Sequence, residues 1–333
     1  MTSVKVIEGP PLPPSPARVK DSDSPPVRVG VVQHAWSPSG LVEWLDAAID
    51  AAAARGARIV FLPEVTLSRY PADTVPTGVA SDQAEDLETG PTIAFARAAA
   101  ARNGIYVHAS LYRRGDDVDG APDGLGLNTA VIVDPSGDIV ATTNKLHIPV
   151  TAGYYEDKYF RAGPAGPDDP YRVYVLDDLG DVRVGLPTCW DEWFPEVARA
   201  YSLGGANIVV YPTAIGSEPD HPDFDTQPLW QQVIIGNGIA NGLFMVVPNR
   251  TGTETKPDGT PGNTFYGSSF VSDPYGRVLA QAPRDEPCVL LADLDLAQRQ
   301  DWLDLFPFLR TRRPDTYAAL TRPVDPEHPY GAR

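Results

Sequence analysis

The chain has 333 residues, a formal net charge of −17 and a sequence pI near 4.6. Nucleic acid and anionic membranes would repel such a protein at long range, so we expect neither as a partner. The length allows a sizeable buried core, and no apolar run is long enough to span a bilayer, so we expect one large cytoplasmic protein.

Cysteine and histidine usage gives no sign of a metal. The two cysteines cannot form a disulfide framework, and the five histidines are scattered without the spacing of a metal site. We therefore predict no metal ion.

Residues 1–26 are rich in proline and poor in large apolar side chains, as in GPPLPPSPARVKDSDSPP. Such a segment cannot bury enough surface to hold one conformation, so we predict a flexible arm. It also lacks the basic and then apolar pattern of a secretory signal. No composition break marks a linker within 27–320, which predicts a single domain followed by a C-terminal tail at 321–333.

The segment 41–64 predicts a helix and then a covered strand. LVEWLDAAIDAAAARG is rich in alanine and ends at Gly56, a suitable C-cap, and ARIVFLP is apolar on both faces. Glu64 follows Pro63 at the end of this strand. Partial desolvation there raises the pKa of a carboxyl and suits it to accept a proton, although a solvated loop carboxylate is the alternative.

Two charged residues follow the next apolar strands. Lys145 lies in IVATTNKLHIP, where the strand and a proline stop would hold its ammonium in place; an ordinary surface lysine is the alternative. Glu156 lies in GYYEDKYF, and the alternative to a role in the site is that it is one of several charges in a surface turn. For His147 we expect only a packing role.

Cys189 lies in RVGLPTCWDEWFPEVARA, where an apolar strand ends and a helix begins at Pro195. A thiol at a helix N-terminus should have a lowered pKa and should lie near unpaired N–H groups that bind an oxyanion. A buried small hydrophobe is the alternative for such a cysteine. Asp191 can cap the helix, and Cys288 in EPCVLLADLDL is predicted to be core.

The two halves of the chain repeat weakly. Three motifs recur in the same order, at 27–30 and 182–185, at 56–64 and 205–213, and at 134–137 and 273–276. Each half predicts a strand, a helix, a second strand and later a hairpin with an Asp-Pro-x-Gly turn. Two sheets that are each covered by helices must bury their other faces against each other, which predicts an α/β fold, a four-layer α-β-β-α sandwich. Its strand ends would bring Glu64 and Cys189 together.

Glu64 in FLPE, Lys145 in NKLHIP and Cys189 in GLPTCWDEWFPE resemble the Glu-Lys-Cys triad of the nitrilase superfamily of carbon–nitrogen hydrolases. The stretches GYYEDKYF and YPTAIGSEP are most similar to the N-carbamoylputrescine amidase branch. The resemblance covers 27–320, and the prediction of the sandwich rests jointly on it and on the weak repeat. The resemblance implies no cofactor and a homo-oligomer built on a two-fold dimer. It also implies that Glu156 lies beside the cysteine and orients Lys145 or the substrate amine.

The resemblance implies acyl transfer through a thioester. Glu64 would take the thiol proton, Cys189 would attack the carbonyl carbon, and Lys145 with the Trp190 N–H would stabilise the oxyanion. Ammonia or an amine would leave, and water activated by Glu64 would hydrolyse the thioester. A carbamoyl substrate would give an amine, carbon dioxide and ammonia.

The residues after Cys189 bear on the substrate. Relatives that hydrolyse N-carbamoyl amino acids carry arginines there, whereas this chain has Glu192 and Trp193, which favour a cation. Glu218 in AIGSEP is a further candidate for binding an amine, with a solvated loop charge as the alternative. We expect N-carbamoylputrescine or a similar N-carbamoyl amine. A β-ureidopropionase or another N-carbamoyl amino acid amidohydrolase, an aliphatic amidase, a nitrilase and a catalytically silent scaffold are the alternatives.

Overall fold

The computed structural model describes residues 4–22, 24–115, 124–164, 168–325 and 327–329. The helices in these residues are α1 (Leu41–Ala53), α2 (Pro91–Asn103), α3 (Pro195–Leu203), α4 (Gln227–Asn241) and α5 (Ala297–Leu305). The strands of the first half are β1 (Val6–Glu8), β2 (Val27–Gln33), β3 (Ile59–Phe61), β4 (Tyr106–Arg113), β5 (Leu127–Val133), β6 (Ile139–Asn144), β7 (Val150–Thr151) and β8 (Tyr154–Tyr155). Those of the second half are β9 (Tyr174–Leu176), β10 (Val182–Gly185), β11 (Ile208–Val210), β12 (Phe244–Val247), β13 (Thr251–Thr255), β14 (Pro261–Tyr266), β15 (Phe270–Ser272), β16 (Val278–Gln281) and β17 (Cys288–Leu294).

Two large sheets repeat the same arrangement. The first has the order β1-β17-β2-β3-β4-β5-β6 and the second the order β16-β15-β12-β11-β10-β9. In the first sheet β2, β3 and β4 are parallel, as are β10, β11 and β12 in the second. Each sheet continues with an antiparallel hairpin, β5–β6 or β15–β16, whose turn is closed by a hydrogen bond from Gly137 to Asp134 or from Gly276 to Asp273. The predicted repeat is present in the fold.

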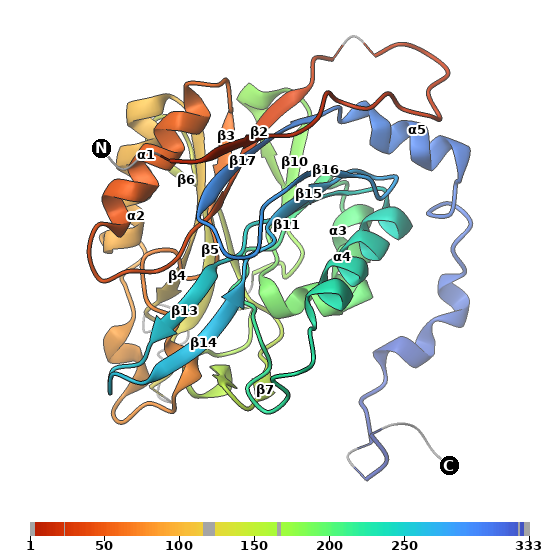
Figure 1. Cartoon of the computed structure of the whole chain (residues 1–333). Helices are drawn as coiled ribbons and strands as arrows, with labels where there is room; N and C mark the ends of the chain where they lie inside the picture. The colour runs from red at the N-terminus through yellow and green to blue at the C-terminus, as the bar shows by residue number, and fades with distance from the viewer. Residues whose placement is uncertain (1–3, 23, 116–123, 165–167, 326, 330–333) are drawn as a thin grey trace.

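Helices cover the outer face of each sheet. The pair α1 and α2 lies on the first sheet and the pair α3 and α4 on the second, on opposite sides of the molecule (Figure 1). Between the sheets lies an apolar core to which Val31 and Phe61 contribute from the first sheet and Val184 and Val210 from the second. The predicted four-layer α-β-β-α sandwich is confirmed.

The N-terminal segment differs from the predicted flexible arm. Strand β1 pairs in parallel with β17, and the Arg18 guanidinium forms ion pairs with Asp295 at 2.8 Å and Asp301 at 2.9 Å. The prediction considered only the low apolar content of the arm itself. The edge of β17 and the acidic residues around α5 supply partners that the arm's composition could not reveal.

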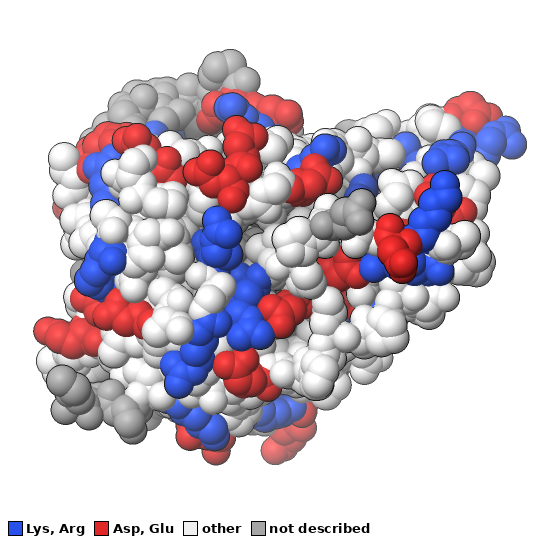
Figure 2. Space-filling model, turned by 90° about the horizontal axis from the view of Figure 1, so that it is seen from above, with Lys and Arg blue, Asp and Glu red and all other residues white. Residues whose placement is uncertain are grey.

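Charges of both signs are interspersed on the surface. Seen from above, Lys and Arg side chains gather in a band with acidic side chains on both sides (Figure 2). Surface ion pairs include Arg28 with Asp293 and Arg183 with Asp181, each at 2.8 Å. The net charge of −17 is therefore not spread as one uniform acidic surface over this face.

Candidate active site

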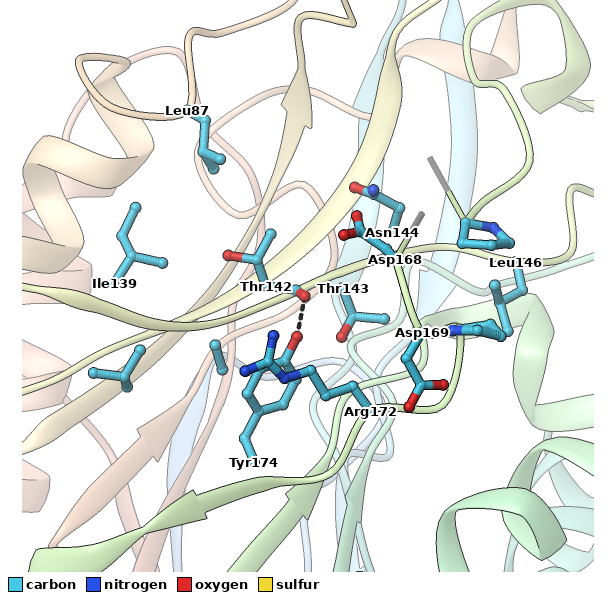
Figure 3. Close-up of a pocket in the computed structure, with 14 residues that line it drawn as sticks. Leu87, Ile139, Thr142, Thr143, Asn144, Leu146, Asp168, Asp169, Arg172 and Tyr174 are labelled. Carbon is cyan, nitrogen blue, oxygen red and sulfur yellow. Dashed lines mark hydrogen bonds between the residues drawn. The ribbon is translucent and has the colours of Figure 1, made fainter. Parts of the chain in front are cut away.

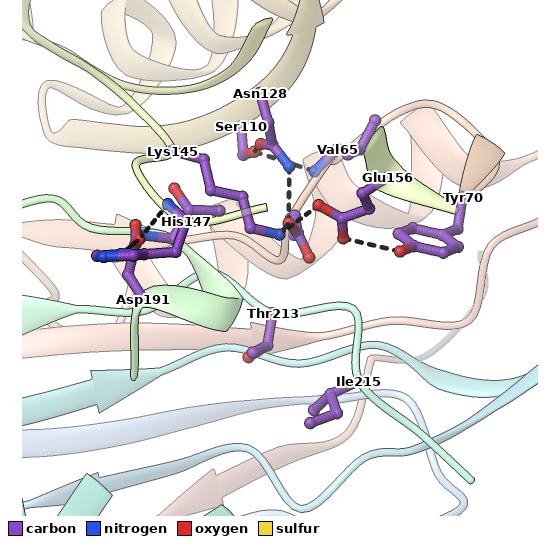
Figure 4. A network of polar contacts seen from close by, with 12 residues as sticks. Val65, Tyr70, Ser110, Asn128, Lys145, His147, Glu156, Asp191, Thr213 and Ile215 are labelled. Carbon is purple, nitrogen blue, oxygen red and sulfur yellow. Dashed lines mark hydrogen bonds and ion pairs between the residues drawn. The ribbon is translucent and has the colours of Figure 1, made fainter. Parts of the chain in front are cut away.

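Glu64 follows β3 at the carboxyl end of the parallel strands, as predicted. Its side chain is fully buried. The Oε1 atom accepts hydrogen bonds from Asn128 Nδ2 at 2.7 Å and from Lys145 Nζ at 3.0 Å, within the network of Figure 4. The Oε2 atom is buried and has no hydrogen-bond partner in the described part of the chain. Oε1 of Glu64 is thus fixed by two hydrogen bonds, whereas Oε2 is free to accept one.

The backbone next to Glu64 has an unusual conformation. Val65 has a φ of 48°, in the left-handed region that β-branched residues rarely adopt. The fully buried guanidinium of Arg250 donates to the carbonyl oxygens of Glu64 at 2.9 Å and Ser68 at 2.7 Å, and also to that of Val65. Strained backbone persists only where its surroundings hold it, so Arg250 holds the turn that carries Glu64.

Lys145 directly follows β6, and its ammonium bridges two carboxylates. The Nζ atom lies 3.0 Å from Glu64 Oε1 and 2.6 Å from Glu156 Oε2, and the side chain is fully buried. Burial lowers the pKa of Lys145, but the Glu156 and Glu64 carboxylates outweigh this effect and hold the pKa well above its ordinary value. The lysine is therefore charged, and the surface-lysine alternative is wrong.

Glu156 is the second buried carboxylate that contacts the Lys145 ammonium, besides Glu64. Its Oε1 atom accepts a hydrogen bond from the Tyr70 hydroxyl at 2.8 Å. Burial raises the pKa of Glu156 to about 7; Lys145 opposes this rise and Glu64 adds to it. The alternative of a solvated surface charge is wrong, and Glu156 lies where it can orient the Lys145 ammonium.

Cys189 begins a tight turn, η5 (Cys189–Trp193), directly before α3. Its φ of 34° is in the left-handed region, and its N–H donates to the Pro212 carbonyl at 3.1 Å. Burial raises the pKa of the thiol well above its ordinary value; Glu64 adds to this and Lys145 opposes it. The predicted lowering of this pKa is wrong because the thiol is desolvated beside carboxylates. If this thiol were a nucleophile, it would need a base to take its proton.

Asp191 joins two segments that come from opposite sheets. Its buried carboxylate accepts hydrogen bonds from the backbone N–H groups of Thr188 and His147, both at 2.9 Å, and lies 2.7 Å from His147 Nδ1. The His147 ring stacks on Phe194 with centroids 3.7 Å apart. The packing role predicted for His147 is confirmed, and Asp191 also holds the segment after Lys145 against the turn of Cys189.

A small cavity of about 60 Å³ opens onto Cys189. Its walls are Pro149, Thr151, Tyr154, Glu156, Cys189, Trp190, Ala214, Ile215 and Glu218. These residues include two carboxylates and no Lys, Arg or His. Glu218 is partly buried and burial raises its pKa. Trp190 and Glu218 thus lie on the cavity wall.

Glu192 and Trp193 do not line this cavity. The Glu192 side chain is fully buried, its backbone carbonyl accepts a hydrogen bond from Asn237 of α4 at 3.0 Å, and neither residue lines the cavity at Cys189. Successive residues of a tight turn point in different directions, so closeness in sequence to Cys189 did not bring these side chains to the cavity. The expectation is corrected: Trp190 and Glu218 face the cavity, and Glu192 and Trp193 do not.

A larger cavity, of about 420 Å³, lies along β6 (Figure 3). Asp169, Arg172 and Tyr174 line it, and the Tyr174 hydroxyl donates to the Thr142 carbonyl. None of the four predicted catalytic residues is on its walls. Buried charge, rather than cavity size, therefore identifies the candidate active site.

Three residues that hold Glu64 and Glu156 in place were not predicted from the sequence: Asn128 and Tyr70, which donate to the carboxylates, and Arg250, which donates to the Glu64 backbone carbonyl. Asn128 is near the start of the buried strand LNTAVIV, and Arg250 follows the apolar run FMVVPN. A polar side chain within or just after a buried apolar run needs a partner, and this signal could have found both. Tyr70 carries no such signal.

The remaining predictions for this region concern metals and the second thiol. No group of three or more metal-ligating side chains occurs in the residues that the structure describes. No helix in those residues is long and apolar enough to cross a membrane. Cys288 is fully buried in β17, as predicted for a core residue.

The chain is similar to known carbon–nitrogen hydrolases. The family model of carbon–nitrogen hydrolases matches residues 28–304. The chain is 35% identical over 299 residues to a citrullinase of Francisella tularensis, covering 89% of this chain and 98% of that protein. It is 35% identical over 244 residues to an N-carbamoylputrescine amidase of Arabidopsis thaliana, covering 72% and 76% of the two chains.

A solved structure extends the agreement to the fold. A carbon–nitrogen hydrolase from Helicobacter pylori G27 superimposes with a TM-score of 0.79 at 33% identity, covering 89% of this chain and 99% of the other. The family match spans both sheets and includes Glu64, Lys145, Glu156 and Cys189. The chain therefore belongs to the carbon–nitrogen hydrolase family, as its three motifs predicted.

Proposed function

We propose that the protein hydrolyses a carbamoyl C–N bond of an N-carbamoyl amine through a thioester on Cys189. The main support is the buried Lys145, which bridges Glu64 and Glu156 near a buried thiol. A relative that is 35% identical is named N-carbamoylputrescine amidase, a name that specifies an N-carbamoyl amine as the substrate of that protein.

In the first half of the reaction, Glu64 takes the proton of Cys189 while the sulfur forms a bond to the carbamoyl carbon. The carbonyl oxygen becomes an oxyanion, which the charged Lys145 stabilises together with the backbone N–H of Trp190. Trp190 is in the first turn of η5, where N–H groups have no acceptor within the helix. Glu64 then gives the proton to the terminal nitrogen, the C–N bond breaks and ammonia leaves.

In the second half, water replaces ammonia. Glu64 takes a proton from water, the oxygen attacks the thioester carbon, and the C–S bond breaks as the sulfur regains a proton from Glu64. The product is a carbamic acid, which separates into carbon dioxide and the amine. The same base thus serves both halves without a cofactor.

The cavity favours a substrate with a cationic tail. Two carboxylates, Glu156 and Glu218, are on its wall. Glu156 pairs with Lys145, whereas Glu218 forms no salt bridge within the described residues. A substrate carboxylate would meet no cationic partner on the wall, whereas an ammonium could pair with Glu218. This arrangement supports N-carbamoylputrescine over N-carbamoyl amino acids.

The test is ammonia release from a panel of substrates at equal concentration. The panel contains N-carbamoylputrescine, citrulline, N-carbamoyl-β-alanine, an aliphatic amide and a nitrile. We expect the highest kcat/KM with N-carbamoylputrescine. A preference for N-carbamoyl-β-alanine would reject the substrate but not the thioester route, which Cys189→Ser tests separately.

We also propose a homo-oligomer built on a two-fold dimer. Large apolar side chains are exposed on α3, on α4 and after α5; Leu203 is 49% exposed, Leu229 48% and Phe306 52%. An isologous contact of these helices would cover such side chains on both subunits. Sedimentation at micromolar concentration that shows only a 35.9 kDa monomer would contradict the proposal.

A further inference from the structure

Asn128 contacts both charged residues at the centre of the site. It lies in β5 and is fully buried. Its side-chain Nδ2 donates to Glu64 Oε1 at 2.7 Å, and its backbone carbonyl accepts a hydrogen bond from the Lys145 N–H at 2.8 Å. Figure 4 shows the Asn128 side chain extending toward the end of Lys145. A neutral residue thus connects the strand to both members of the ion pair.

The orientation of the Asn128 amide is determined by its neighbours. The Ser110 hydroxyl accepts the Val65 N–H at 3.0 Å and donates to Asn128 Oδ1 over a long 3.5 Å. Rotating the amide by half a turn would place Oδ1 against a Glu64 oxygen, so that two acceptors would face each other without a proton. The N–H donor of Asn128 is therefore directed at Glu64.

The two oxygens of Glu64 consequently differ. Oε1 accepts from Asn128 and from Lys145, at 2.7 and 3.0 Å. Oε2 is equally buried and has no partner in the described residues. A buried carboxylate oxygen without a partner is costly, so its occurrence requires an explanation.

We infer that Asn128 is a positioning residue for the base: with Lys145 it occupies Oε1 and leaves Oε2 as the oxygen that exchanges protons. This inference rests on the proposed role of Glu64. In each half of the reaction one proton moves to Oε2, first from the thiol and then from water, and returns to the leaving nitrogen or to the sulfur. Without Asn128 the carboxylate could rotate about its last bond, and either oxygen could turn toward Lys145.

The test compares two substitutions of Asn128 with a matched control in the same strand. Thr129 is the next residue of β5, is also fully buried and donates to Asn144 Oδ1 at 2.7 Å, and no hydrogen bond among the described residues joins its side chain to Glu64. We expect Asn128→Leu to lower kcat by about 10- to 100-fold with KM within about twofold, the range for losing a hydrogen bond to a charged group. Thr129→Val should change kcat by less than about threefold, although it too removes a buried hydrogen bond.

The second substitution, Asn128→Asp, keeps the shape of the side chain and supplies a readout that does not depend on stability. The new carboxyl repels Glu64 when ionised but can donate its proton to Oε1 when neutral. The rate of this variant relative to wild type should therefore rise by about tenfold or more as the pH falls from about 9 to about 5.5. It decides the question even if Asn128→Leu does not fold.

The outcomes separate this inference from the proposed function. If Glu64→Gln is inactive while Asn128→Asp keeps a constant rate relative to wild type at every pH, the positioning role is rejected and the base role stands. If Asn128→Leu folds and loses no more activity than Thr129→Val, the positioning role is also rejected. If Glu64→Gln turns over normally, the proposed mechanism itself fails.

Discussion

Replacing Lys145 by methionine would remove the cation that lets two carboxylates share one buried site. Because Nζ lies 3.0 Å from Glu64 Oε1 and 2.6 Å from Glu156 Oε2, these oxygens are at most about 5.6 Å apart, the sum of the two distances. Two unit charges at that separation repel by about 3 kcal/mol at an effective dielectric constant of about 20. In wild type the shared ammonium offsets this repulsion. Without it, one carboxylate takes up a proton.

The loss of stability should therefore depend on pH. Near pH 8 we expect Lys145→Met to lower the free energy of unfolding by about 3 to 5 kcal/mol, as when one partner of a buried ion pair is removed. A carboxyl whose pKa is higher in the folded than in the unfolded state binds a proton on folding, so its destabilising effect disappears as the pH falls. Near pH 5.5 the loss should be clearly smaller. Methionine is close to lysine in length, which limits any cavity.

Urea unfolding followed by tryptophan fluorescence, at both pH values, measures this loss, and ammonia release measures the rate. We expect kcat to fall by about 100-fold or more because an oxyanion donor is removed. Lys158→Met is the matched control, since Lys158 pairs with Asp157 at 2.6 Å and its side chain is 52% exposed. The control should resemble wild type in both assays. An equal loss of stability at both pH values, or a near-normal rate for Lys145→Met, would refute the reasoning.

Three further predictions follow from the buried site. Cys189→Ser should abolish ammonia release while circular dichroism shows an intact fold, and residual turnover by this variant would count against a thioester. Cys288→Ser should lower the melting temperature and leave the rate of ammonia release nearly unchanged. Glu218→Gln should raise KM for N-carbamoylputrescine by about tenfold or more and spare N-carbamoyl-β-alanine, and equal effects on both would exclude Glu218 as the amine partner. The pKa of Glu156 is raised from 4.5 to about 7, so its ionisation should destabilise the fold increasingly as the pH rises between these values. Glu156→Gln should flatten that part of the plot of unfolding free energy against pH, and an unchanged slope would contradict the assignment.

Several features were predictable because they depend on short stretches of chain. The apolar run before Pro63, the alanine-rich helix and the two Asp-Pro-x-Gly turns each specify their local structure through side-chain pattern and backbone preference. The resemblance then linked Glu64, Lys145 and Cys189, and the structure brings Glu64 and Lys145 into contact. Strand ends converge at one edge of a sandwich, so the position of the site followed from the order of elements.

The surroundings of each group depended on residues distant in the chain. Asn128 is 64 residues from the glutamate that it holds, and Arg250 is 186 residues from the same turn. The direction of the Cys189 pKa shift was mispredicted because the turn alone suggests a helix N-terminus, while burial and neighbouring carboxylates dominate in the folded protein.

The layered fold, the family and the choice of three candidate side chains were predictable from short stretches of the amino-acid sequence, because periodicity, turn residues and motifs are local properties. Two features could be seen only in the folded protein: Trp190 and Glu218, not Glu192 and Trp193, line the cavity, and the N-terminal segment pairs with β17. Desolvation, hydrogen-bond partners and side-chain directions arise only when segments from both sheets pack together. No single stretch of the chain contains them.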